Sequence, residues 1–253
     1  MSATVMIDCF PESLPRYRDG WAVVAVDVVR ATTTAVTAAL SGRRCFPVPS
    51  LEVAVPLAAR LDDPLLVGEL GGSKPFGFHL NNSPAALARR TDIERPMILL
   101  STTGTRLICQ SGPCEAVYVA CLRNHSAQVA RLVGRHEQVA VVGAGARGEF
   151  REEDQLCCAW IAGGLMDAGY EPLGPTARIV QRWRDASADA FVGGKSTEYL
   201  RQTGQLEDLS FIVANVDDVD VTVGFDGLTL TVLPAGPDGI PPGLLHSRWP
   251  WDK

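Results

Sequence analysis

The sequence predicts an α/β domain in which helices cover both faces of a mostly parallel or mixed sheet, giving three layers. Three observations lead to this fold class. Short, almost wholly apolar runs recur along the chain, which is typical of strands buried on both faces. Segments with helical composition lie between these runs, so that strands and helices alternate. The 253 residues, 46% of them hydrophobic, suffice for one large domain, and we expect a single domain over residues 1–253.

The first strand and the first two helices are expected within residues 22–61. Residues 22–28 (AVVAVDV) are apolar except for one acid, so they should form a buried strand. Residues 30–41 are rich in small side chains and should form a helix, which Gly42 is placed to end. A second helix is expected at residues 51–61, where Pro56 should kink or split it.

The same alternation continues to the end of the chain. Residues 68–84 are rich in Gly and Pro and form a loop too long for a simple connector, and such loops are often functional. Residues 220–223 and 228–232 alternate in hydrophobicity around a Gly-Phe-Asp-Gly turn, which predicts a C-terminal β-hairpin. Residues 234–253 form a Pro- and Gly-rich tail. The other expected strands are residues 65–67, 97–100, 116–120, 139–142 and 211–216, and the other expected helices are residues 84–90, 105–111, 126–134 and 152–168.

Composition narrows the functional class. The net charge of −6 gives no basic footprint for nucleic acid, so that class of partner is set aside. The first residues lack the layout of a signal peptide, and no apolar run reaches the roughly 18 residues that a spanning helix needs. Seven cysteines without C-x-x-C spacing are expected to be reduced, buried thiols. We therefore expect a cytoplasmic protein without a membrane partner, and Trp249 and Trp251 are compatible with a homodimer.

Charged and hydroxyl side chains follow four of the expected strands. Ligands of open α/β sheets bind beyond the carboxyl ends of the strands, so we expect these residues to converge on one site. A small anionic substrate would suit it, because an acidic protein can bind an anion only by gathering positive charge locally. The candidates at the four strand ends are Asp27, Arg30, Thr32, Thr33 and Thr34; Glu69; Ser101, Thr102, Thr103, Gly104 and Thr105; and Arg147 and Asp154.

Asp27 and Asp154 each have two interpretations. Asp27 stands at the edge of an apolar run, where an unpaired carboxylate is costly to bury. It is either a metal ligand or nucleophile, or the partner of a nearby arginine such as Arg30. Asp154 heads a stripe formed with Cys158, Ile161 and Leu165, so it lies on the inward face of its helix. It either contributes to the site or only complements the helix dipole.

The hydroxyl runs also have two interpretations. Small hydroxyl residues at a helix N-terminus can converge with backbone N–H groups on an anion. The five residues from Ser101 to Thr105 fit such a cradle, and Thr32 to Thr34 form a second candidate. The alternative is ordinary capping of the helix by one hydroxyl.

Gly143 to Gly148 match the G-x-G-x-x-G spacing of dinucleotide-binding proteins directly after an expected strand. The acids that follow, including Glu152, Glu153 and Asp154, would repel a pyrophosphate. A dinucleotide-dependent oxidoreductase is therefore kept only as an alternative.

Four segments together resemble the 2-phosphosulfolactate phosphatase family. They are DVVRATTT at residues 27–34, GFHLNNSP at 77–84 with Gly68 and Glu69 before it, STTGTR at 101–106, and GEF at 148–150 with EDQLC at 153–157. Residues 204–209 (GQLEDL) also resemble the family, so the likeness runs from about residue 5 to 233. It implies a three-layer α/β/α fold and magnesium-dependent hydrolysis of 2-phosphosulfolactate to sulfolactate and phosphate, a step of coenzyme M biosynthesis in methanogens.

The resemblance also suggests roles for the candidate residues. Asp27, Glu69 and Asp154 would hold one Mg²⁺, an ion that takes oxygen ligands. Arg30 and Arg147 would neutralise the phosphate or sulfonate. Asn82 would orient the substrate or a water molecule, and the hydroxyl runs would donate the remaining hydrogen bonds. Whether Asp27 is instead the nucleophile is left open.

Several positions depart from the family pattern. Leu70 stands where the family usually has arginine, His79 where it has an acid, and Asn81 where it has glycine. An asparagine is also missing between Thr103 and Gly104. We expect these changes to touch the site and to bear on the substrate more than on the fold. A non-catalytic homologue that binds an anion is therefore a further alternative.

Overall fold

The computed structural model describes residues 2–146 and 148–233. Its strands are β1 (Thr4–Asp8), β2 (Ala22–Val26), β3 (Cys45–Val48), β4 (Leu65–Gly68), β5 (Met97–Leu100), β6 (Ala116–Ala120), β7 (Gln138–Gly143), β8 (Glu171–Leu173), β9 (Thr222–Phe225) and β10 (Leu230–Leu233). Its helices are α1 (Ala31–Leu40), α2 (Leu51–Ala58), α3 (Pro84–Ala88), α4 (Gly104–Gln110), α5 (His125–Leu132), α6 (Glu152–Asp167), α7 (Thr176–Trp183), α8 (Lys195–Gln202) and α9 (Leu206–Ala214), with a 3₁₀ helix at Pro11–Tyr17.

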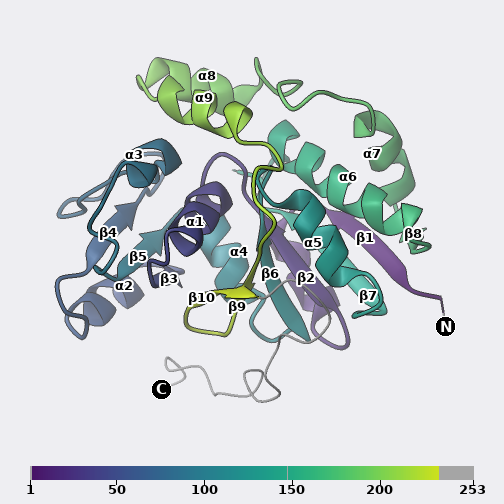
Figure 1. Cartoon of the computed structure of the whole chain (residues 1–253), viewed down its shortest axis with the longest axis horizontal. Coiled ribbons are helices and arrows are strands. Elements are labelled where there is room, and N and C mark those ends of the chain that lie inside the picture. The colour runs from purple at the N-terminus through teal and green to yellow at the C-terminus, as the bar shows by residue number, and fades with distance from the viewer. Residues whose placement is uncertain (1, 147, 234–253) are drawn as a thin grey trace.

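The strands of the described residues form one mixed sheet in the order β4-β5-β3-β10-β9-β6-β2-β7-β1-β8. The pairs β4–β5 and β5–β3 are parallel, as are the pairs from β6 through β2, β7 and β1 to β8. The hairpin of β9 and β10 lies between these two parallel blocks and is antiparallel to its neighbour on each side. The sheet and its helices confirm the expected α/β fold class, and the antiparallel β9–β10 pair confirms the expected C-terminal hairpin (Figure 1).

Both faces of the sheet carry a hydrophobic core, which produces the three layers. In β2, Val24 faces a core built with α5, α6 and α7, whereas Val23 and Ala25 face a core built with α1 and α4. Successive side chains of a strand point to opposite faces, so a strand covered on both sides must be apolar throughout. All five residues of β2 are buried, as the unbroken apolar run predicts.

Residues 211–216 and helix α2 differ from the sequence predictions. Residues 211–216 were expected to form a strand, but most of them belong to helix α9. The β-branched run there favours a strand, yet Leu209 and Ile212, three residues apart, are buried on one face of a helix that packs on the core with α8. Helix α2 continues through Pro56 to Ala58 and ends three residues before the expected Leu61.

Several elements were not expected from the sequence. These elements are strands β1, β3 and β8, helices α7 and α8, and the 3₁₀ helix at Pro11–Tyr17. In Figure 1, α8 and α9 lie side by side at the top of the molecule, above α1 and α3. Within the part of the chain that the structure describes, every helix is too short or too polar to cross a bilayer. The tail expected at residues 234–253 lies outside the described residues.

Candidate active site

Residues that follow four strands line one cavity of about 500 Å³. Asp27 follows β2, Glu69 follows β4, Thr102 and Thr103 follow β5, and Gly145 follows β7. The convergence expected from the strand ends is therefore present. The remaining wall comes from Val29, Arg30, Gly71, Gly72, Asn82, Ala146, Glu149, Arg151, Asp154, Lys195, Ser196, Tyr199 and Leu200.

Asp27 is a nearly buried carboxylate that lines the cavity. Its Oδ1 accepts a hydrogen bond from the backbone N–H of Ala31 (3.2 Å), while none of the described residues donates to Oδ2. Burial raises the pKa of Asp27 from 3.8 to about 7; the Ala31 N–H and Arg30 oppose this rise, while the charges of Glu69 and Glu153 add to it. A crowded carboxylate with a free oxygen is suited to binding a cation or a proton.

Asp154 joins the loops that follow β2 and β7. Its Oδ1 accepts from the N–H of Val28 (2.8 Å) and its Oδ2 from the N–H of Gly145 (3.2 Å). Burial, followed by the charges of Asp27 and Glu153, raises the pKa of Asp154 well above its ordinary value. The residue therefore lies at the site and is more than a partner of the helix dipole.

Glu69 joins the loops that follow β4 and β5. Its two oxygens accept from the N–H of Thr102 (2.6 Å), the hydroxyl of Thr102 (2.8 Å) and the N–H of Gly72 (2.7 Å). Thr103 joins the loops that follow β5 and β7 in a similar way, since its hydroxyl donates to the carbonyl of Gly145 (3.1 Å). These contacts fix the walls of the cavity.

Arg30 directly precedes α1, and its guanidinium is held by two side chains from the far end of the chain. Nη1 donates to Asp208 Oδ2 (2.5 Å) and to Gln205 Oε1 (2.6 Å). Sequence reasoning assigned no role to Gln205 and Asp208. The signal that could have found them is residues 204–209, which belong to the family resemblance.

Most of the hydroxyls expected to bind substrate lie outside the cavity. Thr32 Oγ1 accepts from the N–H of Asp27 and donates to its carbonyl, and Thr33 Oγ1 donates to the carbonyl of Val28. Ser101 and Thr105 cap one another's backbone N–H groups. These hydroxyls bind nearby backbone, as Ser and Thr side chains commonly do at helix starts. Of the two hydroxyl runs, the cavity wall includes only Thr102 and Thr103; Thr32, Thr33, Thr34, Ser101, Gly104 and Thr105 lie behind it.

Asn82 and Arg147 were also expected at the site. Asn82 lines the cavity, and its Oδ1 is buried without a hydrogen-bond partner among the described residues. Arg147 lies outside the described residues. Two cationic residues that were not predicted for the site, Arg151 and Lys195, line the cavity. Both contact Glu149 Oε2, Arg151 at 3.2 Å and Lys195 at 2.6 Å.

The departures from the family pattern touch the site less than expected. Neither Leu70 nor His79 lines the cavity. The Nδ1 atom of His79 accepts from the N–H of Leu66 in the edge strand β4 (2.9 Å). Asn81 donates to Gln205 Oε1 (2.8 Å), so it is part of the network around Arg30. The expectation that each change touches the site is wrong for Leu70 and His79.

The described residues of the glycine-rich turn after β7 and the helix that follows are not arranged as a dinucleotide site. The N–H of Gly145 is donated to Asp154, and α6 begins only at Glu152, with three acids in its first turn. Carboxylates there occupy the helix N-terminus and repel a pyrophosphate.

The protein donors for a metal form a partial set. Within residues 2–146 and 148–233, no three Asp, Glu, His or Cys side chains come together as a group that could hold a metal ion. Asp27, Glu69 and Asp154 are thus not a preformed three-ligand site. Mg²⁺ is often bound by one or two carboxylates together with substrate phosphate oxygens and water, and the chemistry of Asp27 and Asp154 fits that arrangement.

The chain is similar to known proteins over most of its length. Residues 9–225 match the family model described as 2-phosphosulpholactate phosphatase. A Pseudothermotoga lettingae protein named "Probable 2-phosphosulfolactate phosphatase" is 39% identical over 194 residues, covering 74% of this chain and 82% of that protein. Proteins of the same name from Symbiobacterium thermophilum (30% identical; 87% of this chain, 93% of the relative) and Synechococcus sp. (29%; 85% and 94%) match over longer stretches. This chain therefore belongs to the 2-phosphosulpholactate phosphatase family.

Proposed function

We propose that this protein hydrolyses 2-phosphosulfolactate to sulfolactate and phosphate, with Mg²⁺ as cofactor. The observation that carries the proposal is the meeting of Asp27 and Asp154 with the cationic side chains of Arg30, Arg151 and Lys195 around one cavity. The substrate bears a phosphate, a sulfonate and a carboxylate. Three cations on the wall match three anionic groups, and the matched family and the names of the relatives support the same substrate.

The reaction is a phosphoryl transfer to water. Water adds to phosphorus, the bond between phosphorus and the C2 oxygen breaks, and a proton from the water ends on the released hydroxyl. Catalysis of such a step depends mainly on positioning and on neutralising charge. Asp27 and Asp154 would hold Mg²⁺, which when bound neutralises the phosphoryl oxygens.

Side chains of the protein bind the anionic groups of the substrate and orient the reacting molecules. Arg30 has five N–H donors, of which the two on Nη1 are used by Asp208 and Gln205, so Nε and Nη2 remain for an anionic oxygen. Arg151 and Lys195, which also line the cavity and both contact Glu149, attract the other anionic groups. Asn82 Oδ1, which lacks a partner among the described residues, orients the substrate or the attacking water.

The first test measures phosphate release from racemic 2-phosphosulfolactate, phospholactate and p-nitrophenyl phosphate, with and without Mg²⁺. Turnover of phosphosulfolactate that needs Mg²⁺ and far exceeds that of the other esters supports the proposal. If protein treated with a chelator turns the ester over equally fast with and without added Mg²⁺, the metal has no part in the reaction. If the folded protein hydrolyses none of the esters but binds sulfolactate, the non-catalytic anion-binding alternative is correct.

A covalent role for Asp27 can be separated from a metal-binding role. Rapid acid quenching during turnover of ³²P-labelled substrate traps an aspartyl-phosphate if Asp27 is the nucleophile. Absence of trapped label while turnover continues leaves water as the nucleophile.

A further inference from the structure

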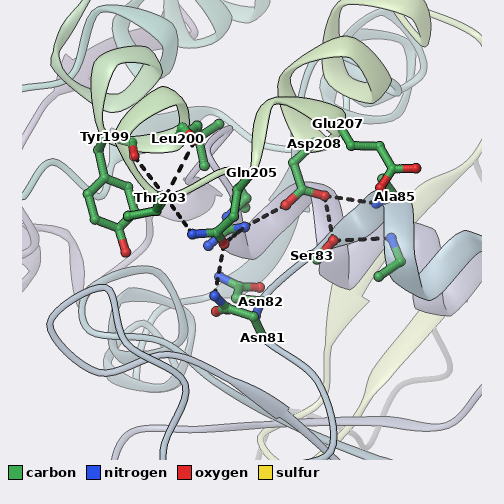
Figure 2. Close-up of polar contacts among 12 residues, drawn as sticks. Asn81, Asn82, Ser83, Ala85, Tyr199, Leu200, Thr203, Gln205, Glu207 and Asp208 are labelled. Atoms are coloured by element: carbon green, nitrogen blue, oxygen red, sulfur yellow. Dashed lines mark hydrogen bonds and ion pairs between the residues drawn. The ribbon is translucent and has the colours of Figure 1, made fainter.

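The segment of α8 and α9 forms one wall of the cavity. Lys195, Ser196, Tyr199 and Leu200 of α8 line the cavity directly. Behind them, Gln205 and Asp208 point from the α8–α9 turn and the first turn of α9 toward residues 81–85 (Figure 2). The two side chains thus connect the α8–α9 segment to residues 81–85, which lead into α3.

Arg30 depends on this segment for its charge partner. The side chains of Arg30 and Asp208 are only 4% and 3% exposed. A buried guanidinium without a partner is strongly unfavourable, and a charge-assisted hydrogen bond is both stronger and more directional than a neutral one. Asp208 and Gln205 both accept from Nη1, so together they set the plane in which the fork of Arg30 lies.

Each of the two acceptors is itself held from the other side. Asp208 Oδ1 accepts from the hydroxyl of Ser83 (2.5 Å) and the N–H of Ala85 (3.1 Å). Gln205 Oε1 accepts from Asn81 Nδ2 (2.8 Å), and the dashed lines of Figure 2 follow both sets of contacts. Because both partners are anchored, the guanidinium has little freedom to turn.

We propose that Asp208, assisted by Gln205, is a positioning residue that orients Arg30 so that its Nε and Nη2 donors face an anionic group of the substrate. The proposal rests on the proposed function for the identity of that group. Asp208 acts only through Arg30 and does not line the cavity itself.

The test compares Asp208→Asn with Glu207→Gln. Asparagine keeps the shape and can still accept from Ser83 and Ala85, but it removes the charge facing Arg30. Glu207 is the neighbouring residue of the same helix and pairs with Arg89 at the surface, where the two side chains are 65% and 58% exposed. Exposed pairs of this kind contribute little, so Glu207→Gln is a matched control.

We expect D208N to raise KM for 2-phosphosulfolactate, and the Kd of inorganic phosphate measured by calorimetry, by about 10- to 100-fold, as for loss of a charge-assisted hydrogen bond. E207Q should stay within about twofold of wild type. A merely structural defect would reduce the folded fraction, which lowers apparent kcat and leaves KM and Kd unchanged. KM and Kd in D208N equal to those in E207Q would overturn the proposal.

A double variant shows whether Asp208 acts through Arg30. In the Arg30→Lys background, D208N should weaken phosphate binding by less than about twofold, because the fork that it orients is gone. Independent, multiplying effects of the two substitutions would contradict the proposal.

Crystal structures of D208N and E207Q provide a readout that needs neither turnover nor a bound ligand. We expect the Arg30 guanidinium to leave the wild-type position in D208N and to keep it in E207Q. An unmoved guanidinium in D208N would refute the positioning role even if the protein turns out to have another substrate. Absence of phosphosulfolactate turnover in wild type, by contrast, bears on the proposed function alone.

Discussion

Gly104 lies so close to Asp27 that a Cβ atom on the glycine would come within 2.2 Å of Asp27 Oδ2. Sequence reasoning assigned Gly104 to an anion cradle, but its role in the structure is to make room for the carboxylate. Any side chain at this position would push either helix α4 or the Asp27 carboxylate out of place.

Gly104→Ala should therefore impair catalysis through Asp27. We expect turnover to fall by about a hundredfold, as for a misplaced reacting group, and the free energy of unfolding to fall by about 1–3 kcal/mol through overpacking. Gly164→Ala in α6 is the matched control, because its Cβ would come within 2.8 Å of Val129, away from the cavity. Kinetic assays measure the turnover of both variants, and urea unfolding measures their stability. Equal turnover in Gly104→Ala and Gly164→Ala would contradict the role of Gly104.

Asp27→Asn should abolish turnover whether Asp27 binds the metal or attacks phosphorus. The same change should stabilise the metal-free protein at neutral pH, because it removes a buried carboxylate that lies near the like charges of Glu69 and Glu153. Phosphate release and thermal unfolding in chelator measure the two effects. Asp226→Asn in the β9–β10 turn serves as control and should keep wild-type activity. Wild-type turnover in D27N would exclude Asp27 from the mechanism.

His79→Asp and Leu70→Arg, which restore the usual family residues, should alter kcat/KM by less than about threefold, since neither side chain lines the cavity. In wild type His79 accepts from the edge strand at Leu66, a contact that an aspartate can also make. Steady-state kinetics of the two variants test the expectation. A rise of tenfold or more in either one would show that the position contacts the substrate after all.

His136 should make stability depend on pH. Its Nε2 lies 2.8 Å from the Tyr118 hydroxyl and its Nδ1 2.8 Å from Glu115 Oε1. Burial lowers the pKa of His136, although the hydrogen bond to Glu115 opposes the shift. The unfolded chain then binds a proton near pH 6.5 that the folded protein takes up only at lower pH, so the contribution of His136 to the free energy of unfolding falls as the pH drops below about 6.5. The raised pKa values of Asp27 and Asp154 act in the opposite direction, so the His136 contribution must be isolated by substitution.

Urea unfolding between pH 7.5 and pH 5 tests this expectation. As the pH is lowered, the free energy of unfolding of His136→Gln should fall less, or rise more, than that of wild type. His125→Gln should act in the same direction, because burial lowers the pKa of His125 as well, against the opposing charge of Asp217. Identical slopes in wild type and H136Q would contradict the assignment.

The fold was predictable where burial alone determines the pattern. The apolar run of β2 and the alternating strands of the C-terminal hairpin carry their structure in their own composition. Strand β3 was missed because it contains Pro47, a residue that is uncommon inside strands. Helix α9 was mistaken for a strand because its β-branched residues favour one locally, whereas packing on the core requires a helix.

The candidate site was predictable only in part. Strand ends are visible in the sequence, so Asp27, Glu69 and Asp154 could be found at the cavity. The partners of Arg30 could not, because Asp208 is 178 residues away and no spacing rule connects the two. The threonines were placed at the correct helix start, but local backbone groups compete for their hydroxyls. The Mg²⁺ cofactor, the homodimer and the cytoplasmic location stay predictions.

The position of the β9–β10 hairpin has a consequence for biosynthesis. On the ribosome, β3 and β6 emerge long before Thr222, yet β9 and β10, which join them in the sheet, follow all the other strands that the structure describes. Until residues 222–233 are made, the block that ends in Glu69 and Thr102 and the block that ends in Asp27 share no continuous ladder of backbone hydrogen bonds. A nascent chain stopped before the hairpin would present two open strand edges to its neighbours, so β9 and β10 both join the two blocks that line the cavity and cover edges that could otherwise pair with another chain.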